Sequence, residues 1–118
     1  MPYVPKVRLL FKIMLRLRDE KAAEGLWFEG VWLSENGDDE GALLAFSHAR
    51  LLDRQFGGAY YNHAALVEKK HGRGAEALRA WQEYLRVAEF DKRQARETVA
   101  KVKGHVADLQ RMFGQRKD

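Results

Sequence analysis

The sequence contains no cysteine, and its only prolines are Pro2 and Pro5. Without cysteine the chain forms neither disulfide bonds nor thiolate metal sites. Long apolar runs are also missing near the N-terminus, where Arg8, Lys12 and Arg16 leave no run longer than three residues. We therefore expect no signal peptide and no membrane span, and a cytoplasmic location.

Acidic residues are scarce at both ends of the chain and concentrated in its middle. Residues 1–21 hold six basic and two acidic residues, and residues 91–118 hold eight and four. Residues 22–90 reverse this balance, with seven basic and eleven acidic residues. This distribution differs from that of a uniformly basic nucleic-acid-binding protein. A chain of 118 residues that is 46% hydrophobic and 32% charged predicts one globular, helical domain over 1–118.

A pattern of small and aromatic residues occurs twice, 35 residues apart. The segment "GALLAF" at 41–46 corresponds to "EALRAW" at 76–81. Each copy follows a glycine, Gly37 or Gly72, which can end a helix with a positive φ angle. Asp38 then offers an N-cap to the first copy. Ala42 and Ala77 are small enough to let two antiparallel helices approach closely, so each unit is predicted to be a helical hairpin.

These segments resemble the tetratricopeptide repeat, whose signature contains alanine and, four residues later, a large aromatic residue. "ALLAF" and "ALRAW" match that part of the signature, and the resemblance covers residues 22–90. The first half of the signature is matched only loosely, the terminal proline is missing, and the period is one residue longer than the family's. The resemblance implies an all-α solenoid of antiparallel hairpins, with repeats at 22–54 and 57–90.

The repeat pattern also suggests what the two ends of the chain form. Residues 5–19 are interpreted as an extra N-terminal helix, the second half of an incomplete repeat. Residues 91–113 are interpreted as a capping helix, because its apolar positions repeat every three or four residues. That stripe consists of Ala95, Val99, Val102, Val106, Leu109 and Phe113.

No catalytic constellation is recognisable. The four histidines are scattered along the sequence, and no pair has the spacing of a metal-binding helix. Acidic residues at 38–40 are interpreted as a capped helix start rather than a metal site. We therefore expect a protein that is not an enzyme and that needs no cofactor or metal.

The repeat resemblance implies a concave groove lined by the first helix of each hairpin. A protein or peptide partner of unknown identity, extended or helical and with an acidic flank, would suit the apolar, amide and cationic side chains there. Trp27 either lines this groove or is buried against the N-terminal helix. The groove is predicted to contain Trp27, Val31, Ser34, Asn62, His63, Leu66, Lys69, Lys70 and Lys101.

The N-terminal segment supports an alternative function, homo-oligomerisation. Its helix is apolar over most of its circumference, and one neighbouring helix cannot cover all of it, so we expect either a twofold dimer or a helix of a partner to cover the rest. The predicted interface contains Leu9, Phe11, Ile13, Met14 and Leu17. Binding of a membrane or nucleic-acid surface through the basic ends is disfavoured, because no clean polar face is present and the aromatic residues lie in the acidic middle.

Overall fold

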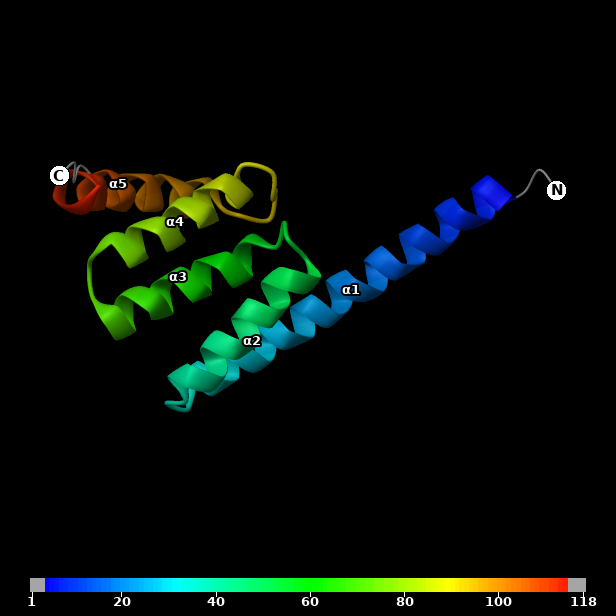
Figure 1. Ribbon diagram of the computed structural model, residues 1–118, viewed down its shortest axis with the longest axis horizontal. Coiled ribbons are helices and arrows are strands. Elements are labelled where there is room, and N and C mark those ends of the chain that lie inside the picture. Colours follow the sequence, from blue (N-terminus) through cyan, green and yellow to red (C-terminus); the bar gives the residue numbers. More distant parts are fainter. Residues whose placement is uncertain (1–3, 115–118) are drawn as a thin grey trace.

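Five α-helices make up the computed structural model, which describes the backbone of residues 4–114 and the side chains from Lys12 onward. In chain order they are α1 (Val4–Glu35), α2 (Asp39–Leu52), α3 (Gly57–His71), α4 (Ala75–Ala88) and α5 (Arg96–Phe113). Within the described residues there is no strand, which confirms the all-α prediction. Each helix packs against the next one in the chain (Figure 1).

The first helix differs from the prediction. A separate N-terminal helix over 5–19 is wrong, because α1 runs without a break from Val4 to Glu35. The physical reason lies in residues 19–24, Asp-Glu-Lys-Ala-Ala-Glu, where no glycine or proline ends the helix and most residues favour it. The N-terminal segment therefore cannot fold back on Trp27. Instead, the first half of α1 extends beyond the other helices (Figure 1).

The two predicted hairpins are formed by α1 with α2 and by α3 with α4. Gly37 and Gly72 have φ angles of 87° and 81°, as predicted for the residues that end α1 and α3. The N–H of Asp38 donates to the carbonyl of Leu33 at 2.8 Å, which closes the last turn of α1. The side chain of Asp38 then accepts from the N–H of Gly41 at 2.9 Å and caps α2.

Small residues and aromatic rings occupy the helix crossings, as the repeated pattern predicts. Ala42 and Ala77 are fully buried, and Phe46 and Trp81 are 1% and 6% exposed. In the first hairpin a Cβ atom added to Gly30 would lie 2.6 Å from the ring of Phe46. The absence of a side chain at Gly30 is therefore what lets α1 and α2 close on each other.

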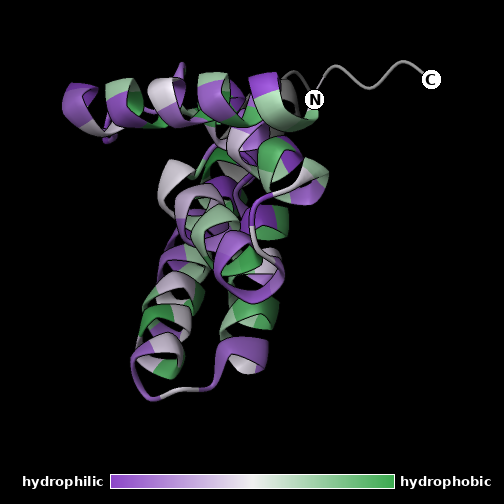
Figure 2. Cartoon of the chain, turned by 90° about the vertical axis from the view of Figure 1, so that its left-hand side faces the viewer, coloured by the Kyte–Doolittle hydropathy of each residue, from purple (hydrophilic) through white to green (hydrophobic). Residues whose placement is uncertain are grey.

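The last helix covers α4. The predicted stripe of α5 faces the second hairpin, with Val102 and Leu109 buried and Val106 and Phe113 packed beside them. The helix begins at Arg96, and residues 91–95 form the connection to α4 rather than part of the cap. Figure 2 shows hydrophobic segments alternating with hydrophilic ones along the helices, which is the pattern of helices that bury one side. No helix in the described part of the chain has the length and hydropathy needed to cross a membrane.

A buried aspartate links the α4–α5 connection to the start of α3. Asp91, in the α4–α5 connection, accepts hydrogen bonds from the backbone N–H of Gly57 at 2.8 Å and from Nε of Arg93 at 2.8 Å. Asp91 therefore caps the start of α3 from a loop 34 residues away in the sequence. Burial opposes ionisation, but the hydrogen bonds from Arg93 and Gly57 outweigh it and hold the pKa of Asp91 below its usual value.

Replacing Gly30 with alanine should destabilise the fold. The added methyl group displaces the Phe46 ring, and such overpacking typically costs about 1–3 kcal/mol. Gly25→Ala is the matched control, because it lies in the same helix with nothing within 4 Å of the added Cβ. We expect Gly25→Ala to raise the free energy of unfolding by about 0.5–1 kcal/mol through helix propensity. Urea unfolding of both variants checks the difference, and equal effects would contradict the close crossing.

The fold should lose stability in acid through Asp91. Because its pKa is lower in the folded than in the unfolded protein, the carboxylate stabilises the fold above pH ~4. That contribution disappears as the pH falls through the folded-state pKa. Unfolding in urea at neutral pH and at about pH 3 should show a smaller acid-induced loss for Asp91→Asn than for the unmodified chain. The same loss in both proteins would show that Asp91 does not contribute.

Candidate binding surfaces

The predicted concave groove is largely filled by its own side chains. Trp27 donates its indole N–H to the side-chain oxygen of Asn62 at 2.7 Å, linking α1 to α3. The Trp27 ring also packs against Phe28 and Phe56, with ring centroids 4.9 and 5.8 Å away. Trp27 is therefore half-buried between helices. Its neighbours are α3 and the α2–α3 connection rather than a separate N-terminal helix.

Part of the apolar floor predicted for the groove belongs to the core. Leu66 is 6% exposed and clusters with Ala42 and Phe46, and Val31 packs against that cluster. Leu66 is therefore covered by the chain's own residues, whereas Val31 is half-buried and its contact with a partner stays a prediction. Small and apolar residues at helical spacing identify the covered side of a helix, but they do not say which neighbour covers it.

The cationic residues predicted for the groove bind the preceding helix. Lys69 Nζ lies 3.3 Å from Oδ2 of Asp39, and Lys70 forms an ion pair with Glu40. Both acidic partners lie in the first turn of α2, where negative charge is favourable, so these pairs join the end of α3 to the start of α2. Of the remaining predicted groove residues, Ser34 is half-buried near the end of α1 and Lys101 is exposed on α5.

His63, another of the predicted groove residues, belongs to a different site. Its Nδ1 atom lies 3.1 Å from NH1 of Arg50, which belongs to α2. Burial and, secondly, the charge of Arg50 lower the pKa of His63 to about 4, against a smaller opposing effect of Glu76. His63 is therefore neutral at physiological pH, and its Nδ1 accepts the hydrogen bond from the guanidinium.

Arg50 has an unusual environment for a cation. Its guanidinium carbon lies 4.5 Å from the centre of the Tyr60 ring, in cation–π geometry. Its Nε atom is buried without a hydrogen-bond partner, and no carboxylate of the described residues lies within 4 Å of the group. A neutral histidine and an aromatic ring are thus its nearest partners. A partly buried charge with such partners favours an incoming anion.

Two hollows meet at Arg50. The larger, about 460 Å³, lies between α2 and α4, and we call it the arginine groove. It is lined by Ser47, Arg50, Leu51, Arg54, Tyr60, Glu83 and Arg86. The smaller, about 300 Å³, adds His63, Glu76 and Arg79 on the other side of Arg50. The one acidic side chain of the arginine groove, Glu83, already binds Arg86, with 2.9 Å between Oε2 and Nε. Positive charge therefore predominates there.

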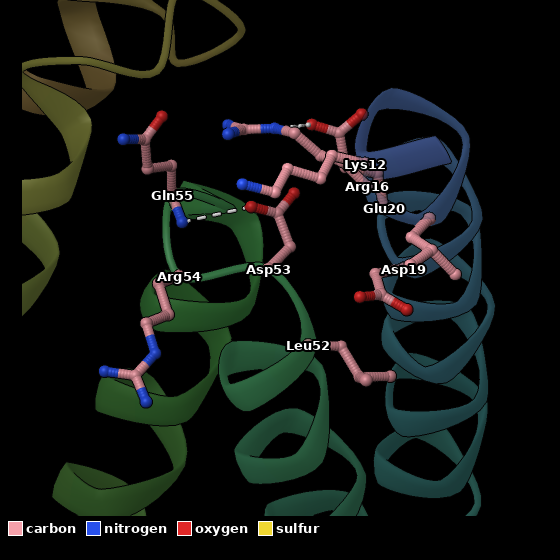
Figure 3. A pocket seen from close by; sticks show the side chains of 9 residues that line it. Lys12, Arg16, Asp19, Glu20, Leu52, Asp53, Arg54 and Gln55 are labelled. Carbon is pink, nitrogen blue, oxygen red and sulfur yellow. Dashed lines mark hydrogen bonds and ion pairs between the residues drawn. The ribbon is translucent and has the colours of Figure 1, made fainter. Parts of the chain in front are cut away.

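A third hollow, of about 490 Å³, has balanced charge. Figure 3 shows it between the first half of α1 and the α2–α3 connection, with Arg16 and Glu20 on one side and Asp53 on the other. Its ionisable residues are three basic and three acidic, namely Lys12, Arg16, Arg54, Asp19, Glu20 and Asp53. Such a mixture selects no particular charge. Elsewhere, no group of three or more histidine, aspartate or glutamate side chains in the described residues could hold a metal ion.

Comparison with known protein families, curated proteins and solved structures finds no match for this chain. The geometry of the molecule is therefore the basis for assigning a function. The arginine groove was missed at the sequence level because its members come from three helices, and Arg50 occupies no special place in the 35-residue pattern. The nearest signal was His63, one of the groove residues predicted from the sequence.

Replacing Asn62 with alanine should destabilise the fold rather than only weaken binding. It leaves the half-buried indole N–H of Trp27 without its acceptor, which typically costs about 1–3 kcal/mol. Ser34→Ala is the comparison, because Ser34 also lies on the predicted groove but has no such bond among the described residues. Thermal unfolding followed by circular dichroism measures both, and an unchanged midpoint for Asn62→Ala would contradict the Trp27–Asn62 link.

Proposed function

We propose that this chain is a non-catalytic protein-interaction module, related in design to tetratricopeptide repeats. In this proposal it binds a carboxylate-bearing segment of a partner protein in the arginine groove. Two consecutive helical hairpins and the repeated alanine–aromatic segments support the first part. The second part places the binding surface away from the concave side. On that side Trp27 of α1 is hydrogen-bonded to Asn62 of α3, and Leu66 of α3 packs in the core.

The observation that carries the proposal is the environment of Arg50. A guanidinium held by a neutral histidine and stacked on Tyr60 keeps its positive charge uncompensated by any carboxylate within 4 Å in the described residues. The stacking and the hydrogen bond also fix its orientation before a ligand arrives, which lowers the entropy cost of binding. A guanidinium fixed in this way is suited to accept a carboxylate through charge-assisted hydrogen bonds.

The surroundings of Arg50 favour a peptide segment over a single small anion. Leu51 is 68% exposed at the edge of the arginine groove and offers an apolar contact beside the charge. Arg54 adds a second positive charge to the lining of the arginine groove. A segment that carries an acidic side chain next to an apolar one would match both features.

Binding of a matched pair of peptides tests this proposal. The first peptide contains two glutamates followed by leucine, and the second replaces both glutamates with glutamine. Nuclear magnetic resonance titration should show shifts of the α2 and α4 amides around Arg50 with the first peptide only. Arg50→Gln should weaken this binding roughly 10- to 100-fold, as expected for loss of charge-assisted hydrogen bonds worth ~1.5–3 kcal/mol.

Arg16→Gln is the control variant, because Arg16 is an exposed arginine of α1 that lies outside the groove. It removes the same charge and should leave the affinity within about twofold, since exposed charges interact weakly. The proposal fails if both variants lose affinity equally, or if the shifts map to α1 and α5. It also fails if both peptides bind equally well.

A further inference from the structure

The face of α1 that points away from α2 carries a line of exposed apolar side chains. Met14, Leu17, Phe28 and Trp32 are each about 60% exposed, at 65%, 59%, 59% and 61%, and Ile13 is 45% exposed. Between them lie Lys21 and Glu24, also exposed. We call this set the outer stripe. Its members Met14, Leu17, Lys21, Glu24 and Phe28 are separated by alternating steps of three and four residues, the spacing of a helix–helix seam.

In the second hairpin, the face that corresponds to the outer stripe is covered. With the 35-residue offset, Phe28 corresponds to His63 and Trp32 to Val67. In α3 these positions are covered, since His63 binds Arg50 of α2 and Val67 is only 6% exposed. The outer stripe of α1 is therefore the equivalent of a covered face, and among the described residues no helix lies over it. This correspondence explains why two large aromatic residues occur there.

We propose that a second copy of this chain covers the outer stripe, with the two α1 helices antiparallel and the twofold axis between residues 22 and 23. In this register, residues whose numbers add up to 45 lie opposite each other. Leu17 then faces the second copy's Phe28, Ile13 faces the second copy's Trp32, and Lys21 faces the second copy's Glu24. Every apolar residue of these pairs meets an apolar residue, and every charge meets the opposite charge.

Charge selects this direction over the parallel one. A parallel pairing in register would place Lys21 against the second copy's Lys21 and Glu24 against the second copy's Glu24. Like charges at such central positions disfavour an arrangement, and proteins use this repulsion to exclude wrong pairings. The antiparallel arrangement instead forms two opposite-charge pairs around the axis, so the stripe is complementary to itself.

The extent of the stripe is sufficient for a dimer but not for a permanent one. From residue 13 to residue 32 the helix is about 30 Å long. At exposures of 59% and 61%, Phe28 and Trp32 alone leave roughly 90–150 Å² each in contact with water. Together with Ile13, Met14 and Leu17 on both copies, the buried area is on the order of 1,000 Å², near the lower limit of specific interfaces. We therefore expect a dimer that dissociates on dilution.

The second copy would also support the first half of α1, which extends beyond the other helices (Figure 1). A helix of about 15 residues without a packed neighbour is only marginally stable in water. Of the interface predicted from the sequence, Ile13, Met14 and Leu17 belong to the outer stripe. The side chains of Leu9 and Phe11 lie outside the described residues. The interface proposed here is longer, because it includes Phe28 and Trp32.

Sedimentation equilibrium over a range of protein concentrations tests the dimer. The unmodified chain should convert from monomer to dimer as concentration rises, and Leu17→Glu and Phe28→Glu should each raise the dissociation constant at least tenfold. Leu44→Glu is the matched control, because Leu44 is 74% exposed on α2 and outside the stripe, and it should leave the constant unchanged. Circular dichroism at a concentration where the unmodified chain is monomeric should show the same helix content for all three variants as for that monomer.

A charge exchange tests the register. Lys21→Glu and Glu24→Lys should each weaken the dimer, because each single change places like charges opposite each other. The double variant Lys21→Glu, Glu24→Lys should restore it. A chain that stays monomeric at every concentration overturns the proposal, as does a dimer that Leu17→Glu and Phe28→Glu leave intact. If the double variant does not restore the dimer, the antiparallel register is wrong.

Discussion

The contact between Gly30 of α1 and the ring of Phe46 on α2 determines the orientation of the other parts of the molecule. Because a Cβ at residue 30 would lie 2.6 Å from that ring, the two helices meet along one defined line. With this line fixed, Trp27 turns toward Asn62 of α3, while Phe28 and Trp32 turn away from the chain's own core. The same packing places Arg50 at the junction of α2, α3 and α4. Both proposed surfaces therefore follow from the crossing of the first hairpin.

In the acidic middle of the chain, ion pairs decide which charges stay uncompensated, and composition does not show this. Lys69 and Lys70 are engaged by the first turn of α2, and Glu68 accepts hydrogen bonds from Trp81 at 2.8 Å and His105 at 2.7 Å. These contacts join α3 to α2, α4 and α5. What remains around Arg50 is a local excess of arginine within a segment that is acidic overall. A net charge counted along the sequence thus gives the wrong sign for this groove, because the sign depends on which carboxylates are already paired.

The sequence predicted six helices, and the structure has five because the first two form the single helix α1. Gly37, Gly72, Ala42, Ala77 and the two aromatic residues that follow these alanines carry strong local signals, since a positive φ angle and a close crossing each require particular residue types. The helix end predicted near residue 20 is wrong, because it came from extending the 35-residue period toward the N-terminus, over a segment with no helix-ending residue of its own. The site was harder to predict, because Arg50, Tyr60 and His63 come together only through the packing of α2 on α3. Likewise, periodicity alone could not decide whether Leu66 faced a partner or the core.

Amide hydrogen exchange along α1 measures the central claim most directly, namely that the chain itself covers only one side of this helix. Residues 19–35 should exchange slowly at every protein concentration, because they pack on α2. Residues 4–18 should exchange quickly in dilute solution, where the helix is unsupported, and slowly in concentrated solution. Equal and strong protection of the whole helix in a dilute, monomeric sample would contradict the account, because another part of the same chain would then have to cover α1.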